Sequence, residues 1–257
     1  MTFRGDAVLV TGAAKGIGRA FALTHAAARV GVAAVDVDEE GLRELCSLSP
    51  WIRAWICDVR DPEAVGAVVR DVEEQVGAVD RVVNSAGVAP VASLLSSTSE
   101  EVRRVMEINY LGTVNVCRAV LPRMTSRGRG EVVNLASIAG WIPTKGLGAY
   151  SASKFAVVAF SEVLAAEARG AGVKVCCVCP SLVHTPMGAS VAEGLTGRTQ
   201  VIGMVDALDV VDETEDALER GELFVFPGWV PKLAVRLRRA WPRLASEVVD
   251  RAVGTSL

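Results

Sequence analysis

The chain has 257 residues, of which 51% are hydrophobic and 22% charged, and its net charge at pH 7 is −3. This composition excludes an intrinsically disordered chain and argues against nucleic acid as a partner, because no excess of positive charge is present. The first ten residues include Arg4 and Asp6 before any long apolar stretch, so we expect no secretory signal. The six cysteines are then expected to be free thiols in the cytoplasm.

Short apolar runs alternate with helical patterns along the chain. Strands are expected at 7–11, 30–36, 51–57, 80–84, 131–137, 173–179 and 223–227. Helices are expected near 16–28, 38–47, 62–76, 99–125, 150–170 and 205–220. Apolar strands joined by connections of helix length indicate a parallel sheet that is covered on both faces. The pattern predicts an α/β fold, a doubly wound parallel sheet of about seven strands, in a single domain over residues 1–257.

A glycine-rich segment, TGAAKGIG at residues 11–18, follows the first expected strand and opens the first expected helix. Gly12, Gly16 and Gly18 permit a tight turn and a close approach of the backbone to a pyrophosphate, which the helix N-terminus also attracts. Asp36 ends the second strand, where a carboxylate binds both ribose hydroxyls and selects NAD. Lys15 favours NADP instead, because it can pair with the 2′-phosphate. We expect NAD to be the cofactor. The alternatives are that the glycine-rich segment is a structural turn without a ligand, and that Asp36 is only an acid that flanks the next helix.

A second group of residues indicates proton-transfer chemistry. Tyr150 and Lys154 are four residues apart, which places them on one face of a helix. The ammonium group is expected to lower the pKa of the Tyr150 phenol. Ser137 lies at the end of the fifth strand, so that strand end, loop and helix start can converge on one substrate oxygen. A Y-x-x-x-K spacing alone is more often a surface pair, but here it accompanies the glycine-rich segment.

With these motifs the chain resembles the short-chain dehydrogenase/reductase family from about residue 5 to 187. Two motifs depart from the family pattern: Ser85 replaces an asparagine, and Ser181 replaces a glycine and is expected to alter the backbone there. The resemblance extends the expected cofactor contacts to Gly12, Lys15, Gly16, Ile17, Gly18, Asp36, Asp58, Val59, Asn84, Ala86, Gly87, Tyr150, Lys154, Pro180, Val183 and Thr185.

The resemblance also implies catalytic roles. Tyr150 would be the general acid/base, Ser137 would polarise the substrate oxygen, and Lys154 would bind the nicotinamide ribose and tune Tyr150. Asn109 would hold a water molecule in a proton relay. The implied enzyme transfers a hydride between a nicotinamide cofactor and a secondary alcohol or ketone, without a metal, as a homodimer or homotetramer. The alternative is a non-catalytic nucleotide-binding sensor or scaffold on the same fold.

Residues 138–149 and 182–204 are expected to shape the substrate pocket, with a lid at about 187–204. The apolar residues of this lid predict a bulky hydrophobic substrate such as a steroid, a retinoid or a long-chain compound: Met187, Val191, Leu195, Val201, Ile202 and Met204. The C-terminal tail, residues 229–257, is basic and amphipathic. It is expected to dock over the pocket or against another subunit, with contact to a membrane surface as the alternative.

The cysteines of the segment VKVCCVCP include a C-x-x-C spacing, Cys176 to Cys179, which is found in zinc and redox sites. The segment is an apolar, strand-like run and the chain has only two histidines, His25 and His184. Buried strand thiols are therefore the preferred interpretation, and no metal site is expected.

Overall fold

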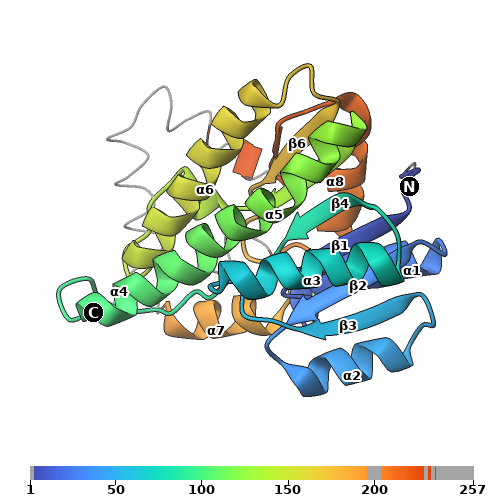
Figure 1. The fold of residues 1–257 in the computed structure, drawn as a ribbon. Coiled ribbons are helices and arrows are strands. Elements are labelled where there is room, and N and C mark those ends of the chain that lie inside the picture. Colours follow the sequence, from blue (N-terminus) through green and yellow to red (C-terminus); the bar gives the residue numbers. More distant parts are fainter. Residues whose placement is uncertain (1–2, 196–203, 229–230, 233–234, 236–257) are drawn as a thin grey trace.

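The computed structural model describes residues 3–195, 204–228, 231, 232 and 235 (Figure 1). Seven parallel strands form one sheet in the order β3-β2-β1-β4-β5-β6-β7. The strands are β1 (Ala7–Thr11), β2 (Gly31–Asp36), β3 (Ile52–Ile56), β4 (Val79–Asn84), β5 (Gly130–Leu135), β6 (Val173–Val178) and β7 (Phe224–Val225). Each strand lies within two residues of its expected bounds, so the predicted fold class is confirmed.

Helices cover both faces of this sheet. They are α1 (Gly16–Ala27), α2 (Glu39–Ser47), α3 (Pro62–Gln75), α4 (Ser99–Met106), α5 (Gly112–Arg127), α6 (Gly148–Glu167), α7 (Pro186–Gly194) and α8 (Ala207–Arg220). Side chains of α1, α2 and α8 pack into one apolar cluster, and those of α3, α5 and α6 into a second, so the sheet has a core on each face. Strand order reverses between β1 and β4, which opens a crevice at the carboxyl ends of the strands.

Two helical segments differ from the sequence prediction. The helix expected at 99–125 consists of α4, a π-helical turn (Glu107–Leu111) and α5, and Asn109 lies in the wide turn. Helix α7 was not predicted and occupies the first half of the expected lid. It begins because Pro186 is the first helical residue and the Thr185 hydroxyl accepts a hydrogen bond from the Gly188 amide at 3.0 Å.

Part of the expected lid and most of the tail lie outside the described residues. This applies to Val201 and Ile202 of the lid, and to residues 229–230, 233–234 and 236–257 of the basic, amphipathic tail.

The thiols of the C-x-x-C segment are buried and free, as expected for strand cysteines. Cys176 packs into the apolar cluster on the α1 side of the sheet, whereas Cys179 belongs to a separate cluster with Trp141. A spacing of three residues in a strand places side chains on opposite faces, so these two sulfur atoms cannot share a ligand.

Candidate active site

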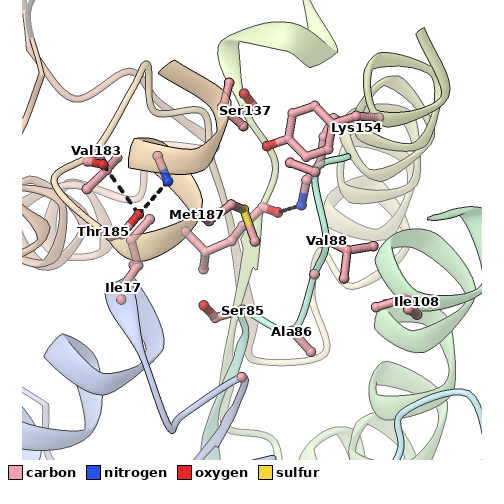
Figure 2. A pocket seen from close by; sticks show the side chains of 18 of the residues that line it. Ile17, Ser85, Ala86, Val88, Ile108, Ser137, Lys154, Val183, Thr185 and Met187 are labelled. Carbon is pink, nitrogen blue, oxygen red and sulfur yellow. Dashed lines mark hydrogen bonds between the residues drawn. The ribbon is translucent and has the colours of Figure 1, made fainter. Parts of the chain in front are cut away.

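A cavity of about 750 Å³ lies at the carboxyl edge of the sheet (Figure 2). Its walls come from the segments that follow six of the strands, β1 to β6, together with residues of α4, the π-helical turn, α6 and α7. Of the expected cofactor and catalytic positions, all line this cavity except Gly18, Asn84 and Asn109. The fold thus brings together residues that are far apart in the sequence.

The glycine-rich segment has a geometry that requires glycine. Gly12 and Gly16 have positive φ angles of 64° and 58°. A Cβ atom on Gly18 would lie 2.2 Å from the Gly12 carbonyl oxygen, and one on Gly16 would lie 3.2 Å from Thr185 Cγ2. The segment therefore closes tightly on itself and on the Pro180–Thr185 segment. No side chain caps the N-terminus of α1, so its amide groups are free for an anion.

Asp36 and Lys15 do not pair with each other. Asp36 Oδ2 accepts a hydrogen bond from the Ala14 amide at 3.0 Å, and Oδ1 accepts from the amides of Val37 and Asp38 at 2.8 and 3.0 Å. Lys15 Nζ lies 2.7 Å from Asp38 Oδ2, and this hydrogen bond raises the pKa of Lys15. The Asp36 carboxylate is thus held by backbone amides, while the Lys15 ammonium group forms its ion pair with Asp38.

At the end of β3, Asp58 and Val59 both line the cavity. Val59 is buried, whereas Asp58 forms an ion pair with Arg60 at 2.6 Å. The hydrogen bond from Arg60 lowers the pKa of Asp58.

Asn84, an expected cofactor contact, is placed elsewhere by the structure. Its Nδ2 donates to Asn134 Oδ1 at 2.8 Å on the neighbouring strand, and neither of these buried residues lines the cavity. Ala86 and Gly87, from the same motif, do line the cavity. The Asn84 side chain thus joins β4 to β5, and its spacing in the motif could not distinguish that role from ligand binding.

Tyr150, Lys154 and Ser137 meet at the end of β5. Tyr150 lies in the first turn of α6, and Lys154 follows one turn later. The Lys154 Nζ atom is 5.7 Å from the centre of the Tyr150 ring. Lys154 Nζ donates a hydrogen bond to the Leu135 carbonyl at 2.6 Å, as Figure 2 shows. The Ser137 hydroxyl accepts a hydrogen bond from the Ala139 amide at 3.1 Å, which fixes it at the start of a 3₁₀ turn (Ile138–Gly140).

Burial determines the direction of both pKa shifts in this group. It raises the pKa of Tyr150, although a hydrogen bond with Ser137 acts in the opposite direction. It lowers the pKa of Lys154 to about 8. The expectation that Lys154 lowers the pKa of Tyr150 is therefore wrong for the protein alone, because the loss of solvation of the phenolate is the larger effect.

Asn109, the fourth expected catalytic residue, is fully buried and does not line the cavity. Its Oδ1 accepts from the Val88 amide at 2.8 Å, and its Nδ2 donates to the Val88 carbonyl at 2.9 Å and to Ser153 Oγ at 3.0 Å. The side chain therefore connects the loop after β4 to α6. Because the partners of the Asn109 side chain are protein groups, its expected role of holding a water molecule in a proton relay stays a prediction.

The remaining wall of the cavity is apolar. Leu147, Val191 and Leu195 form a buried cluster, against which Leu182 and Tyr150 pack. All five residues line the cavity, and Val191 belongs to α7 in the expected lid. This cluster places an apolar surface directly beside the Tyr150 ring.

Ser181 adopts an ordinary backbone conformation. Among the described residues other than glycine, only Arg29 has a positive φ angle. Ser181 therefore occupies a conformation that does not require glycine, and the expected alteration of the backbone relative to the family pattern stays a prediction.

Some residues of the cavity wall were not expected from the sequence. They include Val88, Arg104 and Ile108. Ile108 directly precedes Asn109, and Arg104 is one helical turn earlier, so their positions relative to that residue were the available signal. His184, one of the two histidines, is exposed and does not line the cavity.

The chain resembles known proteins over most of its length. The model of the short chain dehydrogenase family matches residues 6–196. A 1-deoxy-11-beta-hydroxypentalenate dehydrogenase of Streptomyces exfoliatus is 36% identical over 239 residues, which cover 90% of this chain and 86% of the relative. A D-threitol dehydrogenase of Mycolicibacterium smegmatis is 40% identical over 197 residues, covering 75% and 76% of the two chains.

Solved structures share the whole fold. A short chain dehydrogenase/reductase from Burkholderia phymatum in complex with NAD has a TM-score of 0.85 and 26% identity, covering 100% of this chain and 99% of its own. A short-chain dehydrogenase from Streptomyces avermitilis has a TM-score of 0.83 and 29% identity, covering 94% and 95%. The chain therefore belongs to the short-chain dehydrogenase/reductase family, as an NAD(P)-dependent oxidoreductase that acts on CH–OH groups.

Proposed function

We propose that this enzyme interconverts a bulky, hydrophobic secondary alcohol and its ketone with NAD(H) in preference to NADP(H). The observation that carries the proposal is the placement of Tyr150, Lys154 and Ser137 beside an apolar wall, in the same cavity as the Gly12–Gly18 segment and Asp36. This arrangement also favours an enzyme over the alternative of a non-catalytic sensor, because a nucleotide sensor has no need of these three groups beside its ligand.

The residues present fit a dinucleotide. The conformation of Gly12 and Gly16 and the uncapped N-terminus of α1 suit a pyrophosphate, and Ala86, Gly87, Val183 and Thr185 complete the wall. A bound nicotinamide supplies or accepts the hydride. Lys154 is the residue available for the nicotinamide ribose, since its ammonium group has no carboxylate partner among the described residues.

Tyr150 moves the proton. In the reducing direction its phenol donates a proton to the substrate oxygen, and the raised pKa of Tyr150 keeps that proton in place at neutral pH. The Ser137 hydroxyl holds the same oxygen by a hydrogen bond and so orients the carbon that exchanges the hydride. In the oxidising direction Tyr150 must first lose its own proton, and its oxygen then accepts the proton of the alcohol.

The preference for NAD rests on the different surroundings of Asp36 and Lys15. Among the described residues the Asp36 carboxylate has no cation as a partner, and so it would repel a 2′-phosphate. Lys15 could attract that phosphate only by giving up its ion pair with Asp38 at 2.7 Å. Both features disfavour NADP.

The substrate class rests on the apolar wall. Leu147, Leu182, Val191 and Leu195 offer apolar surface and no hydrogen-bonding side chain, which favours a ligand that buries apolar surface of its own. Pro231, the first described residue of the tail, is buried and also lines the cavity. This contact supports a tail that docks over the pocket.

A screen of secondary alcohols and ketones with NAD(H) and NADP(H) tests the proposal, with Tyr150→Phe as the inactive control. We expect turnover that is faster with NAD(H) and with bulky hydrophobic compounds than with short polar ones. Faster turnover of short polar ketones would contradict the argument from the apolar wall. A wild-type preference for NADP(H) would contradict the argument from Asp36.

We further propose a cytoplasmic homodimer or homotetramer. Support for the reducing compartment comes from the six cysteines, which are all free. The one described helix that is long and apolar enough to cross a membrane is α6, which packs on β6 and carries Tyr150. Lys232 pairs with Glu213 of α8 at 3.0 Å, which supports a docked tail over one that binds a membrane.

A further inference from the structure

Within the described residues, the cavity wall contains a cation that has no partner. Four basic and three acidic side chains of these residues line the cavity. Two of the basic ones are paired with acidic ones, Lys15 with Asp38 at 2.7 Å and Arg60 with Asp58 at 2.6 Å, and a third belongs to the catalytic group described above. The fourth is Arg104, whose side chain makes no hydrogen bond and no ion pair within the described part of the chain.

The position of Arg104 in the chain places it at the end of the cavity that is near the end of β3. Arg104 lies on α4, four residues before Ile108, and both line the cavity from the same face of the helix. One turn further on, Gly112 packs so closely on Val59 that a Cβ atom there would lie 2.5 Å from Val59 Cγ2. The Asn115 side chain also donates to the Val59 carbonyl at 2.9 Å. This helical segment is thus fixed beside the end of β3.

The same segment is distinct from the apolar wall of the substrate end. Ile108 is not a member of the cluster formed by Leu147, Val191 and Leu195. The Arg104 side chain, four residues before Ile108, is exposed to solvent where it lines the cavity. The Arg104 guanidinium is therefore available to a ligand group that lies near Asp58 and Val59, at the end of β3.

We propose that Arg104 is a further binding residue for the adenosine diphosphate half of the dinucleotide. The inference rests on the proposed cofactor. A guanidinium presents five N–H donors and packs flat against aromatic rings, so it suits a ligand that is both anionic and aromatic. Without Arg104 the described acidic and basic side chains of the cavity wall would be equal in number, although the ligand contains two phosphate groups.

Fragment titration tests this assignment without any substrate. ADP-ribose and nicotinamide mononucleotide are titrated by calorimetry into the wild type, Arg104→Ala and Arg103→Ala. Arg103 is a matched control, because it is exposed on the same helix, pairs with Glu100 at 3.2 Å and does not line the cavity. We expect Arg104→Ala to weaken ADP-ribose binding by about two- to tenfold and to leave nicotinamide mononucleotide binding unchanged. Arg103→Ala should change neither affinity.

Three results would overturn the assignment. Equal ADP-ribose affinity in Arg104→Ala and the wild type would show that Arg104 does not contact this half. A loss confined to nicotinamide mononucleotide would place Arg104 at the other end of the ligand. A wild type that binds no ADP-ribose would overturn the proposed cofactor itself, a result that differs from the failure of the Arg104 assignment alone. Equal melting temperatures of the three proteins would show that each is folded.

Discussion

A buried histidine far from the cavity makes the stability of this protein sensitive to acid. His25 is fully buried in α1; its Nδ1 donates to the Phe21 carbonyl at 2.7 Å, and its Nε2 accepts from Arg81 Nη1 at 2.7 Å. Arg81, also buried, is held in turn by Glu131 and Glu215. Both ring nitrogens of His25 are therefore satisfied in the neutral form, and a proton on Nε2 would face the guanidinium of Arg81.

The structure gives the size of this effect. Burial, and then the charge of Arg81, lowers the pKa of His25 from 6.5 to about 4. Below pH 6.5 His25 binds a proton in the unfolded chain, whereas in the folded protein it stays neutral down to about pH 4. The contribution of neutral His25 to stability is therefore complete above pH 6.5 and is lost as the pH falls towards 4. One unit of pKa corresponds to about 1.4 kcal/mol, and a change from pH 7 to pH 5 therefore costs about 2 kcal/mol of unfolding free energy.

Urea denaturation at pH 7, 6 and 5 measures this loss in the wild type, His25→Gln and His184→Gln. A glutamine at position 25 offers one acceptor and one donor but does not titrate, so we expect its stability to vary much less over this range. His184 is exposed, and its variant should retain the wild-type dependence on pH. The reasoning would be refuted by a wild type equally stable at pH 7 and pH 5, or by His25→Gln showing the same loss as the wild type.

Three predictions concern the active site. Tyr150→Phe should lower turnover by at least about 100-fold, because the proton donor is lost, while the Kd for NAD measured by calorimetry stays unchanged; retained activity would contradict the assignment. Asp36→Ser should raise kcat/KM with NADP, because the repelling carboxylate is removed, and an unchanged ratio of the two cofactors' kcat/KM values would exclude Asp36 as the selective group. Because the pKa of Lys154 is about 8, its charge is lost as the pH rises, and kcat/KM for ketone reduction should fall above about pH 8. A pH–rate profile that stays level to higher pH would contradict this role of Lys154.

The features predicted correctly from the sequence are those that local chemistry determines. Strands such as Val32–Val35 are apolar on both faces, which only a sheet covered on both sides can bury. Gly12 and Gly16 need positive φ angles, and their spacing after β1 therefore indicated a phosphate-binding turn before any contact was known. Helix α7 was missed because its signals, Thr185 and Pro186, lie inside the segment 182–204, which was interpreted as a loop that shapes the substrate pocket.

Properties that depend on the surroundings of a residue could not be predicted in the same way. The spacing of Tyr150 and Lys154 shows that they are neighbours, but the direction of the pKa shift of Tyr150 follows from the solvation that the phenolate loses in the cavity wall. Likewise, the position of Arg104 before Asn109 does not reveal that Asp38 and Asp58 in the same cavity wall are already paired with Lys15 and Arg60. Only the fold shows which charges remain without a partner.

Asn84 shows how a motif can act on the site without touching the ligand. It stands in register with Asn134, which stands in register with Cys177, across β4, β5 and β6. Asn84 Nδ2 bonds Asn134 Oδ1, and Asn134 Nδ2 donates to Ser161 Oγ at 2.9 Å. Ser161 belongs to α6, two turns after Lys154, so this buried row ties the sheet to the catalytic helix. Because Lys154 must reach the end of β5 from that helix, the asparagine of the motif helps to set the position of the catalytic group.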